Sequence, residues 1–473
     1  MGQYNLKNYK KLDRKFYKIL MDKNSNWRTY CISLLQFIKP HTEYFVRYDL
    51  FFSNNFFYIL FCFFNQSINL FLKLIKWLIR IIEEIILSLF FKKINNIKNF
   101  KSDIVFITCL VNSNTVSSRK NINKDFIFGS IIHNLRKSFN VKVIYINLTR
   151  KNSRLTFNEI KSNKDIIVLK KILSIKNEFL LFLEQIKELK NIIINIPKKN
   201  ISFYEILLIS INIFSYESRH NFRVKVQLSE ILKKMKPKIS VVSFEGHCWE
   251  KLVFEICKRE ISGSKCRNMG YQHAGVIKNQ LHFKRKYRKN FNPDFLLTSG
   301  QQNQKYFYKI FSDKKNKLYD IGSNRHISVP NSLLIKKIRN TKNNNCLIVP
   351  EGTYYETKIL FDFSYAMAKR YENWNFILRT HPQVNMNKFL KKFFIFNRYE
   401  KLNNLIFSQK TFIDDLKDSK FLFYRGSTGA ISGIMNGVTP IYVNLPKEKL
   451  NLDPMFELKK FRLKIKKIDE FEK

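Results

Sequence analysis

The stretch that most constrains the fold is residues 420–443, which read K-F-L-F-Y-R-G-S-T-G-A-I-S-G-I-M-N-G-V-T-P-I-Y-V. An apolar run of strand length at 421–424 leads into a Gly-Ser-Thr-Gly turn at 426–429. Helical spacing of apolar residues follows, Gly437 is a stop signal, and 440–443 is a second strand-like run. The pattern predicts a unit of strand, tight turn, helix and strand.

This 426–429 turn suits a phosphate. It leaves the first backbone N–H groups of the helix without partners, next to the hydroxyl groups of Ser427 and Thr428. A helix start also carries a partial positive charge. In the plainer interpretation, Ser427 caps the helix, and Gly426 and Gly429 only make the turn. The sequence upstream of the turn favours the phosphate.

The composition limits the possible partners. The 473 residues suffice for two or three domains. Lysine and arginine total 85 against 37 acidic residues, and a formal charge of +48 is typical of proteins with an anionic partner. However, Lys, Asn, Ile and Phe are all abundant, as an AT-rich genome predicts, and the lysines are spread along the chain. Zinc-finger spacing, an aromatic RNA-binding signature and a compact basic helix are all missing, so we expect no specific nucleic acid.

Cysteine usage indicates a reducing compartment. The seven cysteines are odd in number, scattered and never spaced C-x-x-C, which predicts free thiols and no structural zinc. Residues 1–28 are polar and basic, without the apolar core or cleavage site of a secretory signal. We therefore expect a cytoplasmic protein.

Residues 1–98 are interpreted as a helical, apolar and basic N-terminal extension. In its second half, polar residues recur every three or four positions, which predicts an apolar helix with one narrow polar stripe. The charges in this stripe argue against a clean transmembrane span. Residues 56–91 form either a helix in the membrane interface, with Lys73, Lys76 and Arg80 near anionic headgroups, or a helix buried against the next domain. The basic surplus favours peripheral contact with the inner face of the cytoplasmic membrane.

Residues 99–328 are predicted to form a Rossmann-like domain. Strands at 104–109 and 141–147, with a helix at 126–139 between them, are the β-α-β opening of a parallel sheet. Further strands, which end in small or polar residues, are expected at 239–244, 266–271, 295–298 and 318–321. Ligands of such sheets bind outside the carboxyl ends of the strands, so this edge is the expected wall of a site.

A linker at 329–344, which contains Pro330 and a T-K-N-N-N tract, separates this domain from a second α/β domain at 345–473. We expect a helix to close the chain. Its elements before the 420–443 unit are predicted at 346–349, 356–370, 375–378, 405–407 and 412–416. Two similar halves joined by a linker imply a cleft.

The second domain carries residues that suit a phosphate-rich ligand. Arg379 offers planar donors, and His381, just before Pro382, can donate from either ring nitrogen. A lone His-Pro pair is more often a turn than a binding site, but with the 426–429 turn it indicates a diphosphate or phosphodiester. Glu351 is either a ligand of a ribose or base edge or a solvated loop acid.

The first domain offers groups for proton transfer. Glu245 follows a predicted strand and is either a general base for an acceptor hydroxyl or a cap for the next helix. His273 is either a base, a phosphate ligand or a turn residue. His247, His273 and His381 all fall at predicted strand ends, and this clustering favours a functional role.

Several catalytic signatures are absent from the sequence. It contains no C-x-x-C, H-E-x-x-H, Walker loop or G-x-S-x-G elbow. It also lacks D-x-D, the usual metal-binding signature of single-domain sugar transferases. We therefore expect neither a metal nor a cofactor, and a mechanism that relies on cations and helix ends.

Six segments, taken in order, carry a resemblance to a known family. They are F-E-G-H-C-W-E-K at 244–251, G-Y-Q-H-A-G at 270–275, N-P-D-F-L-L-T-S-G at 292–300, I-G-S-N-R at 321–325, R-T-H-P at 379–382, and R-G-S-T-G followed by N-G-V-T-P-I-Y-V within 425–443. Together they resemble bacterial surface-carbohydrate biosynthesis proteins of capsule or O-antigen pathways. Those are similar to GT-B glycosyltransferases of the polysialyltransferase and Kdo-transferase type.

The resemblance implies an α/β, GT-B-like fold with two facing Rossmann-like domains, and a nucleotide-sugar transferase whose C-terminal domain holds the donor. Glu245-Gly246 matches the motif that supplies the catalytic acid/base, with Phe244 in place of the first acid. His381-Pro382 matches the motif that binds cytidylate, so a CMP-linked sugar is one expected donor.

The expected site residues follow from both lines of reasoning. Catalysis is assigned to Glu245 and His273. Donor binding is assigned to Glu351, Arg379, His381, Pro382, Gly426, Ser427, Thr428 and Gly429, and acceptor-side contacts to Gly246, His247, Gln272 and Arg325. The expected partners are a nucleotide-sugar donor and a glycan or lipid-linked acceptor. Alternatives are a polyol-phosphate transferase of the CDP-glycerol type and a non-catalytic membrane-bound scaffold of polysaccharide assembly.

Overall fold

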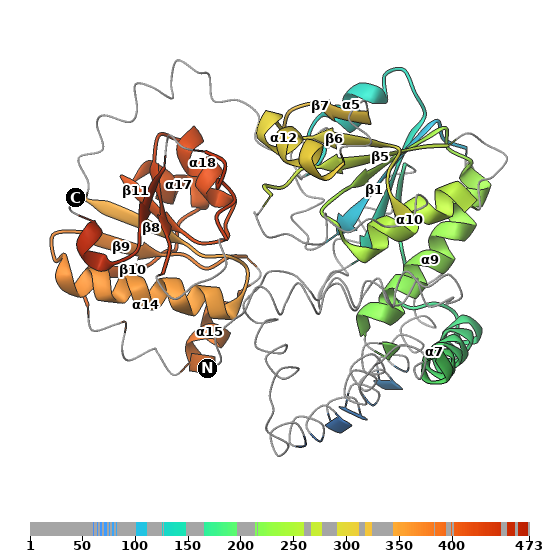
Figure 1. The fold of residues 1–473 in the computed structure, drawn as a ribbon, viewed down its shortest axis with the longest axis horizontal. Helices are drawn as coiled ribbons and strands as arrows, with labels where there is room; N and C mark the ends of the chain where they lie inside the picture. The colour runs from blue at the N-terminus through green and yellow to red at the C-terminus, as the bar shows by residue number, and fades with distance from the viewer. Residues whose placement is uncertain are drawn as a thin grey trace.

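Two parallel β-sheets with helices against them form the two halves of the protein (Figure 1). The computed structural model describes residues 101–110, 127–147, 165–195, 216–259, 266–276, 291–311, 317–323, 344–382, 384–393, 402–445, 452–458 and 462–471, the single residues 125, 213, 214 and 399, and ten positions between 60 and 82. The first sheet has seven strands and the second has six. The predicted GT-B-like α/β fold with two Rossmann-like halves is confirmed.

The first sheet has the strand order β3-β2-β1-β4-β5-β6-β7, and all its neighbouring strands are parallel. The order reverses between β1 and β4, which is where ligands of doubly wound sheets bind. The strands are β1 (Ile104–Leu110), β2 (Val141–Asn147), β3 (Ile166–Val168), β4 (Ile239–Ser243), β5 (Arg267–Gln272), β6 (Phe295–Thr298) and β7 (Leu318–Asp320). The helices are α5 (Ile131–Leu135), α7 (Ile175–Asn195), α9 (Tyr216–Met235), α10 (Cys248–Arg259) and α12 (Gln301–Ile310).

Alternating side chains of β1 enter two different cores. Val105 and Ile107 pack in one core with residues of α9, α10 and α12. Phe106 and Leu110 pack on the other face with Phe128 and the adjoining helix α5. Because both faces are covered, the strands are nearly continuous apolar runs, as is typical of parallel sheets.

The second sheet has the strand order β10-β9-β8-β11-β12-β13, again with parallel neighbours. Helices α14 and α15 pack on one face, and α17 and α18 on the other. The strands are β8 (Asn345–Val349), β9 (Asn375–Leu378), β10 (Leu405–Phe407), β11 (Phe421–Tyr424), β12 (Thr439–Val443) and β13 (Leu463–Ile465). The helices are α14 (Tyr354–Arg370), α15 (Met386–Phe393), α17 (Phe412–Lys417) and α18 (Gly429–Met435).

Two predicted helices differ from the structure. The helix expected at 126–139 is reduced to α5, because the Asp125 carboxylate accepts the N–H groups of Ile127 and Phe128 and holds a turn there. The closing C-terminal helix is wrong for the described residues. Leu463–Ile465 instead pairs with β12 as strand β13, and only a short 3-10 helix, Ile468–Glu470, follows. The predicted domain boundaries stay predictions, and the linker 329–344 lies outside the described residues except for its last position.

The ten described residues of the N-terminal extension are helical. Nine of them are large apolar residues with exposed fractions from 38% to 64%: Leu60, Phe64, Ile68, Phe71, Leu72, Ile75, Leu78, Ile79 and Ile82. The choice between the membrane interface and packing against the next domain for 56–91 stays a prediction. No helix in the described residues combines the length and low polarity of a membrane-spanning segment.

Candidate functional site

The turn after β4 directs Glu245 away from the backbone. Gly246 has a φ of 86°, a left-handed conformation that favours glycine. The carboxylate of Glu250, in the first turn of α10, accepts the N–H groups of Glu245, Gly246 and His247 at 2.9, 2.7 and 2.8 Å. Capping, the plainer role considered for Glu245, is therefore performed by Glu250. The Glu245 carboxylate is left for other partners.

Those partners are two imidazoles. Glu245 Oε1 lies 3.0 Å from His273 Nε2, and Glu245 Oε2 lies 3.1 Å from His247 Nε2. The contact arises because β4 and β5 are neighbours in the sheet, and Glu245 and His273 follow their respective carboxyl ends. The structure thus brings together three of the predicted residues from segments distant in sequence.

The charge of Glu245 depends on these histidines. Burial would raise the pKa of the Glu245 carboxyl, but attraction to His273 and hydrogen bonds from His247 and His273 outweigh burial and hold the pKa well below its usual range. Burial, reinforced by the charge of Glu245, raises the pKa of Glu250 well above its ordinary value. Glu245 is therefore the carboxyl of this pair that ionises first.

His273 has one nitrogen without a partner. The residue is only 8% exposed, and its Nδ1 atom has no hydrogen-bond partner in the described structure. Next to it, Gln272 donates its amide N–H to the carbonyl of Ala274, while its buried Oε1 atom is also unpaired. Buried polar atoms without partners are uncommon in native proteins. Two of them at one strand end indicate a place where a ligand supplies the missing hydrogen bonds.

In the second half, the 426–429 turn follows β11. Gly426 has a φ of 64°, and a methyl group added to it would lie 3.0 Å from Glu351 Cβ. Ser427 is buried, and its Oγ accepts the N–H of Gly429 at 3.2 Å. Thr428 is the N-cap residue of α18, and its side chain makes no capping hydrogen bond. The Thr428 hydroxyl is therefore not used to cap the helix.

A buried ion pair holds the strand end immediately before this turn. Arg425 Nε lies 2.8 Å from Glu356 Oε2, and Arg425 Nη1 donates to the carbonyl of Val443 at 2.8 Å. Both charged side chains are 0% exposed. Thr353 accepts the N–H of Glu356 at 3.2 Å and so fixes the start of α14. The sequence interpretation missed this pair, although a T-x-x-E capping pattern at 353–356 was a visible signal.

The other predicted donor residues lie at the same edge of the second sheet. The strand order β9-β8-β11 places His381, Glu351 and the 426–429 turn in a row, each after a carboxyl end. Two strand spacings, about 10 Å, therefore separate the first from the last. Half-buried His381 accepts the N–H of Val384 through its backbone carbonyl, and Pro382 is exposed.

Arg379 has partners within its own half. Its Nη1 atom donates to Asp415 Oδ2 at 2.7 Å and to the carbonyl of Lys410 at 2.7 Å, and it lies 3.3 Å from Ser408 Oγ. These bonds connect β9 to the segment before α17. A role in phosphate binding would use its other guanidinium nitrogens.

The two halves meet beside these residues. A methyl group added at Gly275 would lie 3.1 Å from Thr428 Cγ2 and 3.3 Å from Pro454 Cβ. Phe456 also packs edge-on against Tyr306 of α12, with 6.1 Å between ring centroids. The strand end that carries His273 thus lies beside the start of α18. Of the predicted site residues, Arg325 alone lies outside the described residues.

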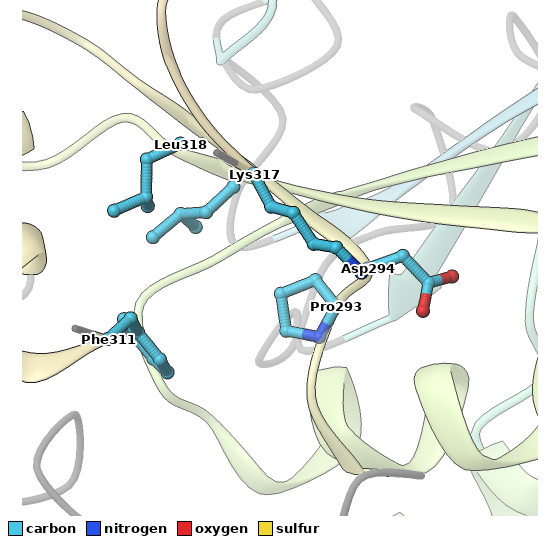
Figure 2. A pocket seen from close by; sticks show the side chains of 6 residues that line it. Pro293, Asp294, Phe311, Lys317 and Leu318 are labelled. Carbon is cyan, nitrogen blue, oxygen red and sulfur yellow. The ribbon is translucent and has the colours of Figure 1, made fainter. Parts of the chain in front are cut away.

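A small pocket lies at the opposite edge of the first sheet, lined by Pro293, Asp294, Leu296, Phe311, Lys317 and Leu318 (Figure 2). Pro293 and Asp294 precede β6, and Lys317 precedes β7, so the pocket lies at the amino ends of these strands. Its cavity volume of about 10 Å³ has room for one water molecule at most. Lys258 pairs with Asp294 at 3.0 Å. None of the predicted site residues lines this pocket, since they follow the carboxyl ends of the strands.

Comparison with known proteins gives similarity of fold. No protein-family profile matches the sequence, and none of the curated proteins compared with it matches. Among solved structures, the chain is similar to UDP-GlcNAc 2-epimerase from Methanocaldococcus jannaschii, with 12% identity, a TM-score of 0.44, and coverage of 77% of this chain and 88% of that one.

Two further structures have similar values. UDP-GlcNAc 2-epimerase from Neisseria meningitidis, bound to UDP-GlcNAc, is 10% identical, with a TM-score of 0.43 and coverage of 74% of this chain and 84% of that one. A glycosyltransferase from Rickettsia africae is 12% identical, with a TM-score of 0.41 and coverage of 77% and 84%. The activities in these names belong to those proteins.

Proposed function

We propose that this protein is a metal-independent glycosyltransferase. It moves a sugar from a nucleotide-sugar donor, for example a CMP-linked one, to a growing surface polysaccharide or lipid-linked glycan. The single observation that carries the proposal is the pairing of Glu245 with His273, whose buried Nδ1 lacks a partner, beside the start of α18 in the other half. This geometry offers a proton acceptor next to a candidate phosphate site.

His273 is the better proton acceptor of the pair. The Glu245 carboxylate, whose pKa is held below its usual range, is a weak base, whereas His273 has a buried Nδ1 atom without a hydrogen-bond partner among the described residues. In the neutral ring, with Nε2–H of His273 donating to Glu245 Oε1, Nδ1 carries the lone pair. Glu245 then fixes the tautomer and orientation of the ring, and His247 holds the second carboxylate oxygen.

The transfer step balances without another reactant. The acceptor hydroxyl gives its proton to His273 Nδ1, and its oxygen forms a bond to the anomeric carbon of the sugar. The bond from that carbon to the donor phosphate oxygen breaks, and the nucleotide leaves with the electron pair. Negative charge grows on that phosphate, and N–H and hydroxyl donors of the 426–429 turn would stabilise it together with His381.

Glu351 suits the nucleoside part of the donor. It lies between His381 and the 426–429 turn in the strand order and packs against Gly426. A carboxylate repels phosphate but accepts hydrogen bonds from ribose hydroxyls. The proposed order along this edge is therefore phosphate at the turn and sugar hydroxyls at Glu351.

The test separates donor binding from chemistry. Thermal midpoints are measured with CMP, CDP, UDP and GDP, because a nucleotide that binds the folded state raises the midpoint. Turnover is then measured as nucleotide release from CMP- and UDP-sugars and from CDP-glycerol, with a membrane extract as acceptor. Product analysis distinguishes sugar transfer from polyol-phosphate transfer and from epimerisation of the donor.

Three variants assign the roles. His273→Ala should lower turnover by about 10² to 10⁴-fold with nucleotide affinity unchanged, whereas His381→Ala should weaken nucleotide binding. His133→Ala, in α5 and not among the predicted site residues, is the matched control and should behave as wild type. Wild-type turnover in His273→Ala would refute the proposed base, and failure of all four nucleotides to bind would favour a scaffold.

We further propose peripheral contact with the inner membrane face through the N-terminal extension. The nine exposed apolar residues between Leu60 and Ile82 are separated by one, three or four positions, which places them on one side of a helix. Such a face suits the boundary between headgroups and acyl chains.

A further inference from the structure

Helix α7 carries a second exposed apolar surface, on an element that the catalytic proposal does not use. Its large apolar residues have exposed fractions from 43% to 63%, and all lie toward one side: Ile175, Phe179, Leu180, Leu183, Ile186 and Ile194. Most are separated by three or four residues, as one helix face requires. We call these six residues the α7 stripe. In Figure 1, α7 lies at the edge of the first half, below α9.

The opposite side of α7 is anchored to the protein. Leu181 and Gln185 are 0% exposed, and Gln185 donates to the carbonyl of Ile213 at 2.5 Å. Glu178 makes a two-point ion pair with Arg223 of α9, with both distances at 2.7 Å. These contacts fix the rotation of the helix, so the α7 stripe faces outward because the core already holds the other side.

Three lysines lie within or beside the stripe. Lys176 precedes Leu180 by four residues, Lys187 follows Leu183 by four, and Lys190 follows Ile186 by four, so each is on the same helix face as a stripe residue. All three are exposed, and none has an ion-pair partner among the described residues. The carboxylate of Glu178 is on the buried side, and half-buried Glu184 borders the stripe beyond Leu180. The stripe thus combines apolar side chains with positive charge.

We propose that the α7 stripe docks on an anionic lipid bilayer. Apolar side chains would enter the boundary between headgroups and acyl chains, while the lysine stems extend along them and place their ammonium groups among lipid phosphates. The formal charge of +48 acts in the same direction, because it attracts the whole chain to an anionic surface.

Other occupants fit the observations less well. A second copy docked through the same stripe would bring its Lys176, Lys187 and Lys190 against those of the first, and like charges in contact oppose association. The apolar face between Leu60 and Ile82 does not cover the stripe, because both are exposed in the same structure. The proposal does not depend on the sugar-transfer chemistry, and it adds a contact from the acceptor-side half.

Vesicle binding by the full chain tests the proposal. Sedimentation is measured with vesicles of phosphatidylcholine alone and of phosphatidylcholine mixed with phosphatidylglycerol. Wild type should bind the mixed vesicles more tightly. The triple variant Lys176→Gln/Lys187→Gln/Lys190→Gln should lower the partition coefficient by about fivefold per lysine. Phe179→Gln/Leu183→Gln/Ile186→Gln should lower it on both compositions by about tenfold or more.

The matched control replaces three apolar residues of similar exposure in the second half. Ile406→Gln/Ile413→Gln/Leu463→Gln changes residues that are 44%, 46% and 51% exposed but scattered over different elements. Its partition coefficient should stay within about twofold of wild type, because apolar residues that are exposed singly do not form a continuous apolar surface that could enter the bilayer. Unchanged thermal midpoints verify that all three triple variants fold.

A site-specific readout separates α7 from the N-terminal extension. Lysine acetylation is followed by mass spectrometry with and without mixed vesicles, and Lys176, Lys187 and Lys190 should be protected. Lys417 on α17 is the control and should react at the same rate in both conditions. Vesicle binding with full acetylation of the three α7 lysines would overturn the proposal, as would wild-type affinity in both α7 variants. A dimer that forms without vesicles and is lost in Phe179→Gln/Leu183→Gln/Ile186→Gln would also overturn the proposal, because a second copy of the chain would then cover the α7 stripe.

Discussion

Removing one partner of the Arg425–Glu356 ion pair should be far more damaging than removing both. The pair joins the end of β11 to α14 at 2.8 Å with both side chains fully buried. Arg425→Met leaves the Glu356 carboxylate buried without its counter-ion, and breaking such a pair costs about 3–5 kcal/mol. Glu356→Leu leaves the Arg425 guanidinium buried without its counter-ion and should cost a similar amount of stability.

The double variant Arg425→Met/Glu356→Leu should recover most of this stability. Replacing a buried ion pair by apolar residues of similar volume is often neutral or stabilising. The cycle should therefore give a coupling free energy of at least about 3 kcal/mol. For a unit of this size, each single variant should lower the thermal midpoint by about 6–20 °C, because 1 kcal/mol corresponds to about 2–4 °C.

The assay is thermal unfolding of the full chain, followed by circular dichroism and by nucleotide binding to the second half. Arg425 directly precedes the 426–429 turn, so both single variants should also weaken nucleotide binding, and the double variant should restore part of it. The matched control is Lys358→Met/Asp362→Leu, an ion pair of α14 whose side chains are 34% and 31% exposed. Its coupling should not exceed about 1 kcal/mol. A double Arg425/Glu356 variant as unstable as the singles would refute the reasoning.

Three further predictions concern the turns that shape the site. Because the pKa of Glu245 is lower in the folded state, its ionised carboxylate stabilises the fold above the ordinary value of about 4.3, and this contribution is lost as the pH falls from there through the folded pKa. Glu245→Gln should therefore lower the denaturation midpoint near neutral pH but not in strong acid, and a deficit that persists in acid would contradict this assignment. Gly426→Ala should weaken nucleotide binding and should lower the free energy of unfolding by about 1–2 kcal/mol, because alanine disfavours the left-handed backbone; the loss is larger if Glu351 cannot move away from the added methyl group. Calorimetry that shows neither change would contradict the role of the 426–429 turn in nucleotide binding. Glu250→Ala should cost about 1–3 kcal/mol, since three backbone N–H groups lose their acceptor, and unchanged chemical denaturation would show that water replaces the carboxylate.

Several strands could be predicted from the sequence because a parallel strand covered on both faces is a continuous apolar run between polar breaks. For this reason 141–147, 295–298, 375–378, 405–407 and 421–424 match the observed bounds. Strands β3 and β13 were missed because lysines surround or interrupt them, so that neither shows as an apolar run between polar breaks. The helix at 126–139 was overestimated because a side-chain turn at Asp125 competes with helix formation.

The location of the site was predictable, but much of its geometry was not. Residues after the carboxyl ends of neighbouring parallel strands must meet at one edge, which brings Glu245 to His273. The sequence could not show that Glu250 caps the turn, because two acids five positions apart are equally placed to do so. It also could not pair Arg425 with Glu356, 69 residues away, since that contact depends on how α14 packs over the sheet.

The most direct test of the central claim is a crystal structure of the protein with a bound nucleotide or a non-hydrolysable nucleotide-sugar. The account predicts that the phosphate binds the 426–429 turn, that the ribose lies at Glu351, and that the sugar points toward His273 Nδ1 across the contact between Gly275 and Thr428. A nucleotide bound at another edge of the second sheet, or a sugar directed away from His273, would contradict it.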